Sequence, residues 1–160
     1  MKIGVVSDTH SLALPQQMWD DFKAVDLIIH AGDICTLEDL KLFMKVRDVK
    51  AVWGNMDDVD VKKLLPEELL FEVGKCRIGI YHGEGPGAQV INVVRKRFTG
   101  KNVNVVVFGH SHNPMNEVID NVLYFNPGSP NDTVRAPYRS YGILNVENGK
   151  ISGKIIKVKA

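Results

Sequence analysis

The segment NVNVVVFGHSHNP, residues 102–114, places two histidines directly behind an apolar run. The run from Asn102 to Phe108 is short and rich in valine, which predicts a strand that is buried on both faces. His110 and His112 follow it at a spacing of two, and the chain has five histidines in all. The pair either belongs to an ordinary polar loop or forms one part of a site whose other residues lie elsewhere in the sequence.

Similar short, β-branched runs recur along the chain and alternate with segments of helical character. We predict strands at 2–6, 26–30, 49–53, 69–73, 76–82 and 102–108, and helices at 15–24, 36–47, 59–65 and 87–98. The segments 116–125 and 140–158 contain no convincing helix, and an Asn148-Gly149 turn joins two strands within the second. βα units followed by antiparallel strands indicate an α/β protein with a mixed sheet, or a pair of sheets, and helices outside.

The composition is that of a soluble globular protein, with 44% hydrophobic and 24% charged residues in a chain of 160. This length suits a single domain, which we expect to span residues 1–160. The net charge of +1 gives no overall field that would attract nucleic acid or an anionic membrane, so we predict neither as a partner. The densest basic cluster, Arg95 to Lys101, is better explained as the last turn of a helix that Gly100 ends.

The two cysteines, Cys35 and Cys76, lack the spacing of a metal motif and are too few for a disulfide framework. They fit a reducing compartment. We find no signal-peptide pattern before the first strand, and no apolar run approaches the ~20 residues that cross a bilayer. We therefore expect a cytoplasmic protein. The sequence leaves its oligomeric state open, a homo-oligomer included.

Five of the predicted strands end in residues that commonly bind metals. These residues are Asp8 and His10 after the first strand, Asp33 after the second, Asn55 after the third, His82, and finally His110 and His112. In open α/β sheets the carboxyl ends of the strands form one edge, and ligands bind there. Seven residues that are spread over more than a hundred positions are therefore expected to gather in one region.

The residue types indicate which metals would bind. Imidazole nitrogen with carboxylate or amide oxygen suits manganese, iron, zinc or nickel better than calcium. Seven donors are too many for one tetrahedral ion and are about right for two ions that share a carboxylate. Within Asp8-Thr9-His10 and His110-Ser111-His112, a spacing of two lets both side chains leave an extended backbone on the same side. The glycines in AGD, WGN, FGH and HGE permit tight turns and close backbone approach.

Each residue taken singly has an ordinary explanation. An aspartate after a strand is commonly a cap or turn residue, and a loop histidine is commonly a surface residue. The conjunction of all seven at strand ends is what favours a metal site. His30 lies inside a predicted strand, and we interpret it as a structural residue that supports the site.

The same residues form recognisable motifs. Asp8-Thr9-His10, Gly32-Asp33, Gly54-Asn55-Met56-Asp57, His82-Gly83 and Gly109-His110-Ser111-His112 resemble, in this order, the five motifs of calcineurin-like metallophosphoesterases. Asn126-Pro127-Gly128-Ser129 resembles the small prokaryotic phosphodiesterase branch of that family, which is related to a retromer subunit. The resemblance implies a four-layer α/β/β/α sandwich of two mixed β-sheets flanked by helices, with a site for two metals at the strand ends.

The resemblance also implies roles for the residues. Asp8, His10, Asp33 and His112 would hold one ion, and Asp33, Asn55, His82 and His110 the other, with Asp33 bridging. Asp33, Asn55 and His82 are the expected catalytic residues. Two divalent ions, with manganese favoured over nickel, iron or zinc, would supply a bridging hydroxide for in-line attack on a small phosphate ester, which we expect to be a diester.

Two other functions are weighed against this one. A non-catalytic, metal-binding interaction scaffold on the same fold is the alternative, since fold alone does not fix activity. A flavodoxin-like nucleotide-binding module is disfavoured because no glycine-rich phosphate loop follows the first strand.

The chain departs from the family pattern at two positions. Met56 stands where many larger relatives carry a histidine thought to protonate the leaving group, and a thioether cannot transfer a proton. Asp57 is the nearest ionisable neighbour, but we do not assign it as the acid. Glu84 stands where many close relatives have a second histidine, and it either orients a ligand histidine or is a plain loop acid.

Overall fold

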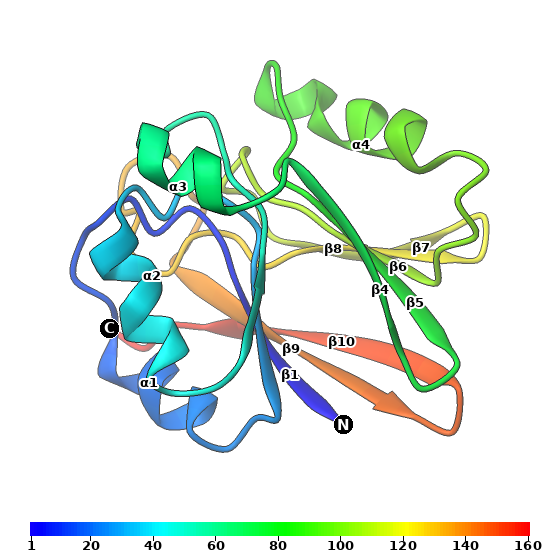
Figure 1. The fold of residues 1–160 in the computed structure, drawn as a ribbon, viewed down its shortest axis with the longest axis horizontal. Helices are drawn as coiled ribbons and strands as arrows, with labels where there is room; N and C mark the ends of the chain where they lie inside the picture. The colour runs from blue at the N-terminus through cyan, green and yellow to red at the C-terminus, as the bar shows by residue number, and fades with distance from the viewer.

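The computed structural model describes residues 1–160 and contains two five-stranded sheets (Figure 1). The first sheet runs in the order β10 (Lys150–Lys157), β9 (Ser140–Glu147), β1 (Lys2–Val6), β2 (Leu27–His30) and β3 (Val49–Ala51). The second runs in the order β4 (Glu68–Val73), β5 (Cys76–Tyr81), β6 (Val105–Val107), β8 (Val122–Asn126) and β7 (Met115–Ile119).

Both sheets are mixed. The strands β1, β2 and β3 are parallel, and the antiparallel pair β9–β10 joins them beside β1. In the second sheet β5, β6 and β8 are parallel, with the antiparallel strands β4 and β7 at the two edges. Because the parallel strands of each sheet point the same way, the loops that leave their carboxyl ends meet at one edge of that sheet.

Alternation along the strands fills three apolar layers. Ile3 and Val5 of β1 pack between the sheets, against residues such as Ile78 and Val107 of the second sheet. Val6, on the opposite face of β1, belongs to a separate layer beneath the helices. Successive side chains of a strand point to opposite faces, so one strand contributes to two cores.

Helices cover the outer face of each sheet (Figure 1). The helices α1 (Gln16–Phe22), α2 (Leu37–Met44) and α3 (Val59–Leu64) pack Phe22, Phe43 and Val61 onto the first sheet. A short 3₁₀ turn, η1 (Gly87–Gln89), leads into α4 (Val90–Phe98), which packs onto the second sheet. Its contacts are made by Val94 and Phe98, four residues apart on one helical face. The predicted α/β/β/α sandwich of two mixed sheets is confirmed.

Two of the predicted strands are shorter than expected by more than one residue. β3 ends at Ala51, because the chain leaves the sheet and the amide of Trp53 donates to the carbonyl of Pro66 at 3.0 Å. β6 begins at Val105, because Asn102 adopts a left-handed backbone conformation with φ of 54°. The predicted 148–149 turn is present, with both central residues at positive φ.

The basic cluster at the end of α4 is paired with acids. Arg97 and Lys101 both contact the carboxylate of Glu68 at 2.8 Å, and Arg95 contacts Asp120 at 2.7 Å. Gly100 follows with φ of 79°. This agrees with the prediction of a helix end rather than a phosphate-binding patch.

None of the helices is both long and apolar enough to cross a membrane.

Candidate metal centre

The seven predicted donor residues gather at the carboxyl ends of parallel strands in the two sheets. They are Asp8 and His10 after β1, Asp33 after β2, Asn55 after β3, His82 after β5, and His110 and His112 after β6. Five of them line one pocket of about 440 Å³, namely His10, Asp33, Asn55, His110 and His112. Asp8 and His82 are buried beneath it. The predicted convergence of the strand ends is therefore present in the structure.

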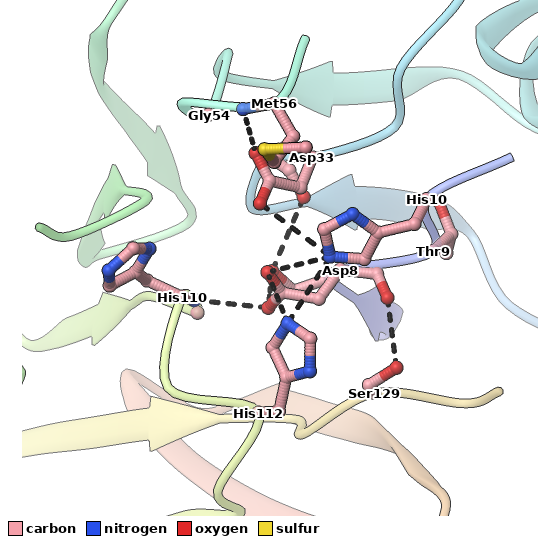
Figure 2. A network of polar contacts seen from close by, with 12 residues as sticks. Asp8, Thr9, His10, Asp33, Gly54, Met56, His110, His112 and Ser129 are labelled. Atoms are coloured by element: carbon pink, nitrogen blue, oxygen red, sulfur yellow. Dashed lines mark hydrogen bonds and ion pairs between the residues drawn. The ribbon is translucent and has the colours of Figure 1, made fainter. Parts of the chain in front are cut away.

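Asp8 lies at the centre of the group, as Figure 2 shows. Its Oδ2 accepts hydrogen bonds from the hydroxyl of Ser7 at 2.8 Å and from the amide of His110 at 3.0 Å. Its Oδ1 is buried and has no hydrogen-bond partner. Three imidazole Nε2 atoms face that oxygen, at 3.4 Å in His112, 3.7 Å in His82 and 3.8 Å in His10.

The protonation state of Asp8 follows from these neighbours. Burial by itself raises the pKa of the Asp8 carboxyl, but the charges of His82 and His112 and the hydrogen bond from Ser7 outweigh it and lower the pKa to about 2. Asp8 is therefore ionised at neutral pH. A buried anionic oxygen without a donor is costly unless a cation faces it, so this atom fits a metal ligand.

Asp33 and His82 form a second part of the cluster. Oδ2 of Asp33 lies 3.2 Å from Nε2 of His82. Its Oδ1 accepts a hydrogen bond from the amide of Met56 at 2.8 Å (Figure 2). Nδ1 of His82 lies 2.7 Å from the carbonyl oxygen of Ala31, so this nitrogen is the donor of that bond. Burial lowers the pKa of His82, but Asp8 and Asp33 outweigh it and raise the pKa to about 9.

Asn55 connects two of the histidines. Its Oδ1 lies 3.1 Å from Nε2 of His82 and 3.1 Å from Nδ1 of His110. The other ring nitrogen of His110 donates to the carbonyl oxygen of Gly85 at 2.9 Å. Asn55, which follows a strand of the first sheet, therefore contacts two histidines that follow strands of the second sheet.

His10 and His112 meet across the pocket. Their Nε2 atoms are 3.2 Å apart, and Nε2 of His10 is also 3.6 Å from Oδ2 of Asp33. Nδ1 of His112 lies 2.5 Å from Oδ2 of Asp132. Asp132 was not among the sequence-predicted site residues. It lies twenty positions beyond His112 in a segment without helix or strand, and the sequence carries no periodic signal there.

Two sets of three donors lie close enough to hold an ion, with all their ligand atoms within 4.8 Å of one another. One set is Asp8, His10 and His112, and the other is Asp8, Asp33 and His82. Asp8 belongs to both sets, whereas the sequence-based division gave it to one ion and assigned the shared position to Asp33. His110 belongs to neither set and contacts the cluster through Asn55 and through its backbone amide to Asp8.

The backbone that carries the donors is not extended, and that part of the sequence argument is wrong. Asp8 and His10 have φ of 59° and 50°, and His110 and His112 have φ of 70° and 59°. These values are left-handed, where a residue other than glycine costs on the order of 1 kcal/mol or more. The donors of each motif meet because tight loops turn them inward, not because alternate residues of a strand share a face.

Glycines beside the donors allow the close approach that the sequence predicted. A Cβ atom on Gly54 would lie 2.6 Å from the amide nitrogen of Asp33, and one on Gly32 would lie 2.6 Å from Nδ1 of His82. A Cβ atom on Gly109 would lie 2.6 Å from Oδ2 of Asp8. Any side chain at these positions would push a donor out of the cluster.

Four further residues find simple roles. His30 is buried beneath the loop, 3.1 Å from the hydroxyl of Thr9, and does not line the pocket, in agreement with a structural role. Asp57 accepts the backbone amides of Asp33, Gly54 and Cys35 and so shapes the loops. Glu84 is exposed and contacts none of the donors, which favours the plain loop acid. The exposed side chain of Met56 lines the pocket.

Known proteins share both the sequence pattern and the fold. Residues 1–149 match the family model of the calcineurin-like phosphoesterase superfamily domain. A "probable metallophosphoesterase" of Methanocaldococcus jannaschii is 36% identical over 165 residues, which cover 99% of this chain and 82% of that protein. The structure of an archaeal phosphodiesterase superposes with a TM-score of 0.78 at 26% identity, over 98% of this chain and 100% of the other.

The fold is also that of Vps29. The crystal structure of Vps29 from Chaetomium thermophilum superposes with a TM-score of 0.81 at 19% identity, over 99% of this chain and 97% of the other. Such low identity shows the fold alone. The family match over nearly the whole chain, together with the relative at 36% identity, shows more. The chain belongs to the calcineurin-like phosphoesterase superfamily.

Proposed function

We propose that this phosphoesterase is a metal-dependent phosphodiesterase that works with two divalent ions held by the seven donors. The observation that carries the proposal is Oδ1 of Asp8, a buried and ionised oxygen without a hydrogen-bond partner that three imidazole nitrogens face. Nitrogen and oxygen donors in this mixture suit manganese, which we favour, and also nickel, iron or zinc.

The proposed ligands form two overlapping sets of four residues, one set for each ion. Asp8, His10, Asp33 and His112 would hold one ion, and Asp33, Asn55, His82 and His110 the other. Both sets of donor atoms in the structure contain Asp8, so we add that this carboxylate would contribute to holding both ions. When bound, two such ions supply Lewis acidity and a hydroxide at neutral pH, because they lower the pKa of a shared water to roughly 7.

The chain's own contribution is to orient the donors. The carbonyl oxygen of Ala31 accepts the proton on Nδ1 of His82, and this leaves Nε2 free to face Asp33 and Asn55. Asp132 accepts the proton on Nδ1 of His112 in the same way. We keep Asp33, Asn55 and His82 as the proposed catalytic residues; Oδ2 of Asp33 and Oδ1 of Asn55 both lie within 3.2 Å of Nε2 of His82, which is buried beneath the pocket.

The site lacks an evident side chain that could protonate the leaving group. Met56 lines the pocket at the position after Asn55, and its thioether cannot donate a proton. Asp57 is buried and accepts three backbone amides, so it is not available as an acid. A leaving group must then depart without a proton from a side chain, which favours aryl or otherwise activated phosphodiesters over alkyl monoesters.

The test is metal analysis of the purified protein combined with an ester screen. Bis(p-nitrophenyl) phosphate and p-nitrophenyl phosphate are compared with an alkyl monoester, before and after chelation and after Mn²⁺ is added back. We expect bound metal, hydrolysis of the aryl diester that chelation abolishes, and its recovery with Mn²⁺. Faster hydrolysis of the alkyl monoester would overturn the diester assignment.

A non-catalytic, metal-binding scaffold on the same fold is the second candidate. The likeness to Vps29 over 99% of the chain is the observation that favours it. The same screen separates the two functions. Metal binding without hydrolysis of any ester would support the scaffold, and metal-dependent turnover would exclude a purely structural role.

A further inference from the structure

The pocket is lined by apolar residues as well as by the candidate metal ligands, which we call the donor cluster. Three apolar residues line it, namely Leu12, Met56 and Val134, which we call the apolar wall. These residues are 59%, 57% and 89% exposed, and they are three of the ten large apolar residues that the molecule leaves exposed. Exposed apolar residues that occur singly need no explanation, but three in one pocket beside polar donors form a binding surface.

The three residues come from three separate loops, and each is tied to the donor cluster by a backbone hydrogen bond. The amide of Leu12 donates to the carbonyl oxygen of Thr9 at 3.1 Å, between Asp8 and His10. The amide of Met56 donates to Oδ1 of Asp33 at 2.8 Å. The amide of Val134 donates to Oδ1 of Asp132 at 2.8 Å, and the other oxygen of Asp132 holds His112.

These bonds fix the wall at a set position relative to the proposed metal ligands. The segment that carries Val134 is fixed further, because the side-chain amide of Asn131 donates to the carbonyl oxygen of Thr9 at 2.7 Å. A wall that is ordered before the ligand binds costs little entropy on binding, so its apolar contacts contribute to affinity and selectivity.

The size of the pocket indicates what the wall contacts. A volume of about 440 Å³ lies in the range of pockets that hold a small organic molecule. It therefore has room for a phosphoryl group on the donor floor and for an organic group beside it. The wall offers that organic group apolar contact.

We propose that the apolar wall binds one organic group of the substrate, and that the preferred substrates are phosphodiesters in which this group is aromatic or otherwise apolar. The inference rests on the proposed phosphodiesterase function and adds to it the three residues that would select the organic group of the ester. It also agrees with the absence of a proton donor at Met56, because aryl ester groups leave without one.

Phosphonates test the wall without a chemical step. Binding of phenylphosphonate and of methylphosphonate to the Mn²⁺-loaded protein is measured by calorimetry. We expect phenylphosphonate to bind at least about tenfold more tightly, the ratio that burial of one small apolar group provides. In parallel, kcat/KM is compared between phenyl p-nitrophenyl phosphate and methyl p-nitrophenyl phosphate, which share one leaving group.

Each wall residue has a matched control elsewhere on the surface. Leu12→Ser, Met56→Ser and Val134→Asn should each lower the phenyl-to-methyl ratio. The controls Leu64→Ser, Met44→Ser and Val118→Asn replace residues of the same type and similar exposure that lie outside the pocket, and they should leave the ratio unchanged. All six side chains are largely exposed, so the variants are expected to fold.

The outcomes separate this inference from the proposed function. Equal affinity for the two phosphonates, or a ratio that wall and control variants lower alike, overturns the apolar wall even if the protein hydrolyses diesters. Failure of the metal-loaded protein to bind either phosphonate, with no turnover of any ester, overturns the proposed function as well. A phenyl-to-methyl ratio that the wall variants lower and the control variants do not supports the inference, whatever the rate of ester hydrolysis.

Discussion

Nδ1 of His112 lies 2.5 Å from Oδ2 of Asp132, and this contact joins the donor cluster to the segment that forms one side of the pocket. Burial raises the pKa of Asp132, but the hydrogen bonds from His112 and from the amides of Val134 and Arg135 outweigh it and hold the pKa well below its usual range. Asp132 is therefore ionised. It accepts the proton of Nδ1 and leaves Nε2 of His112 directed at Asp8, 3.4 Å away.

Asp132→Ala should weaken metal binding without removing a ligand. Loss of the carboxylate that orients a ligand histidine typically costs about 10- to 100-fold in metal affinity. We expect a loss of this size for Mn²⁺ in calorimetry, and a smaller loss in Asp132→Asn, because the amide oxygen can still accept one bond. Asp120→Ala, which removes an exposed acid paired with Arg95, is the control. Unchanged affinity in Asp132→Ala would show that His112 is oriented by other contacts.

Asp33→Ala should remove one of the two proposed ions. The carboxylate contacts His82 and His10 through one oxygen and the amide of Met56 through the other, so its loss opens the middle of the cluster. We expect metal content to fall to one ion or fewer per chain, and turnover of aryl diesters to fall by at least about a hundredfold, as a lost Lewis-acid site implies. Asp48→Ala, at an exposed acid, should change neither. A variant that keeps both ions and full activity would refute the bridging role.

Without metal, the protein should lose stability as the pH rises from about 6.5 to about 9. The pKa of His82 is raised to about 9 in the folded state and is about 6.5 in an unfolded chain, so its stabilising charge is complete below 6.5 and is lost through 9. The pKa of His112 is also raised, in the same direction. Asp8 does not change over this interval, because its pKa is lowered to about 2 and its contribution is lost only in acid.

The expected loss is on the order of 3 kcal/mol, from the shift of His82 at about 1.4 kcal/mol per pKa unit. Thermal unfolding of chelator-treated protein at several pH values measures it. Mn²⁺ should reverse the trend, because the ions bind unprotonated imidazole and gain affinity as the pH rises. A melting temperature that rises with pH in the metal-free protein would contradict the assigned charge states.

Sequence patterns predicted most of this architecture because the central parallel strands are short β-branched runs that are almost entirely buried. They also predicted that the seven candidate ligand residues gather in one region, because the residue after a parallel strand is placed by the sheet itself. The left-handed backbone conformation at Asp8 and His110 was not predictable, since neither residue type alone requires a positive φ. It is imposed by tertiary bonds such as that from the amide of His110 to Oδ2 of Asp8.

Asp132 escaped prediction for a related reason. Its partners are His112, twenty residues away, and the amides of its own irregular segment, so no periodicity marks it. The shared role of Asp8 was missed because the sequence places that residue on one strand end, while the structure surrounds its Oδ1 with imidazoles from both sheets. Such roles depend on the distance between sheets, which sequence spacing does not encode.

Gly54→Ala should damage the metal site through volume alone. The φ angle of Gly54 lies outside the left-handed region, so an alanine there is not strained by its own backbone. Its Cβ atom, however, would lie 2.6 Å from the amide nitrogen of Asp33 and 2.9 Å from the carboxyl carbon of that residue. Since the neighbouring atoms include backbone, Asp33 and its loop must shift, and overpacking of this kind costs about 1–3 kcal/mol of folding stability.

Gly87→Ala is the matched control, because its Cβ atom would meet only the side chain of Ser111 at an ordinary 3.7 Å. We expect Gly54→Ala to lower Mn²⁺ affinity by at least about tenfold, since a ligand displaced by a few tenths of an ångström no longer fits its ion. Gly87→Ala should keep wild-type affinity and melting temperature. Should both variants bind Mn²⁺ as the wild type does, the loop around Gly54 is soft, and Asp33 is not held in place by the close approach of that glycine.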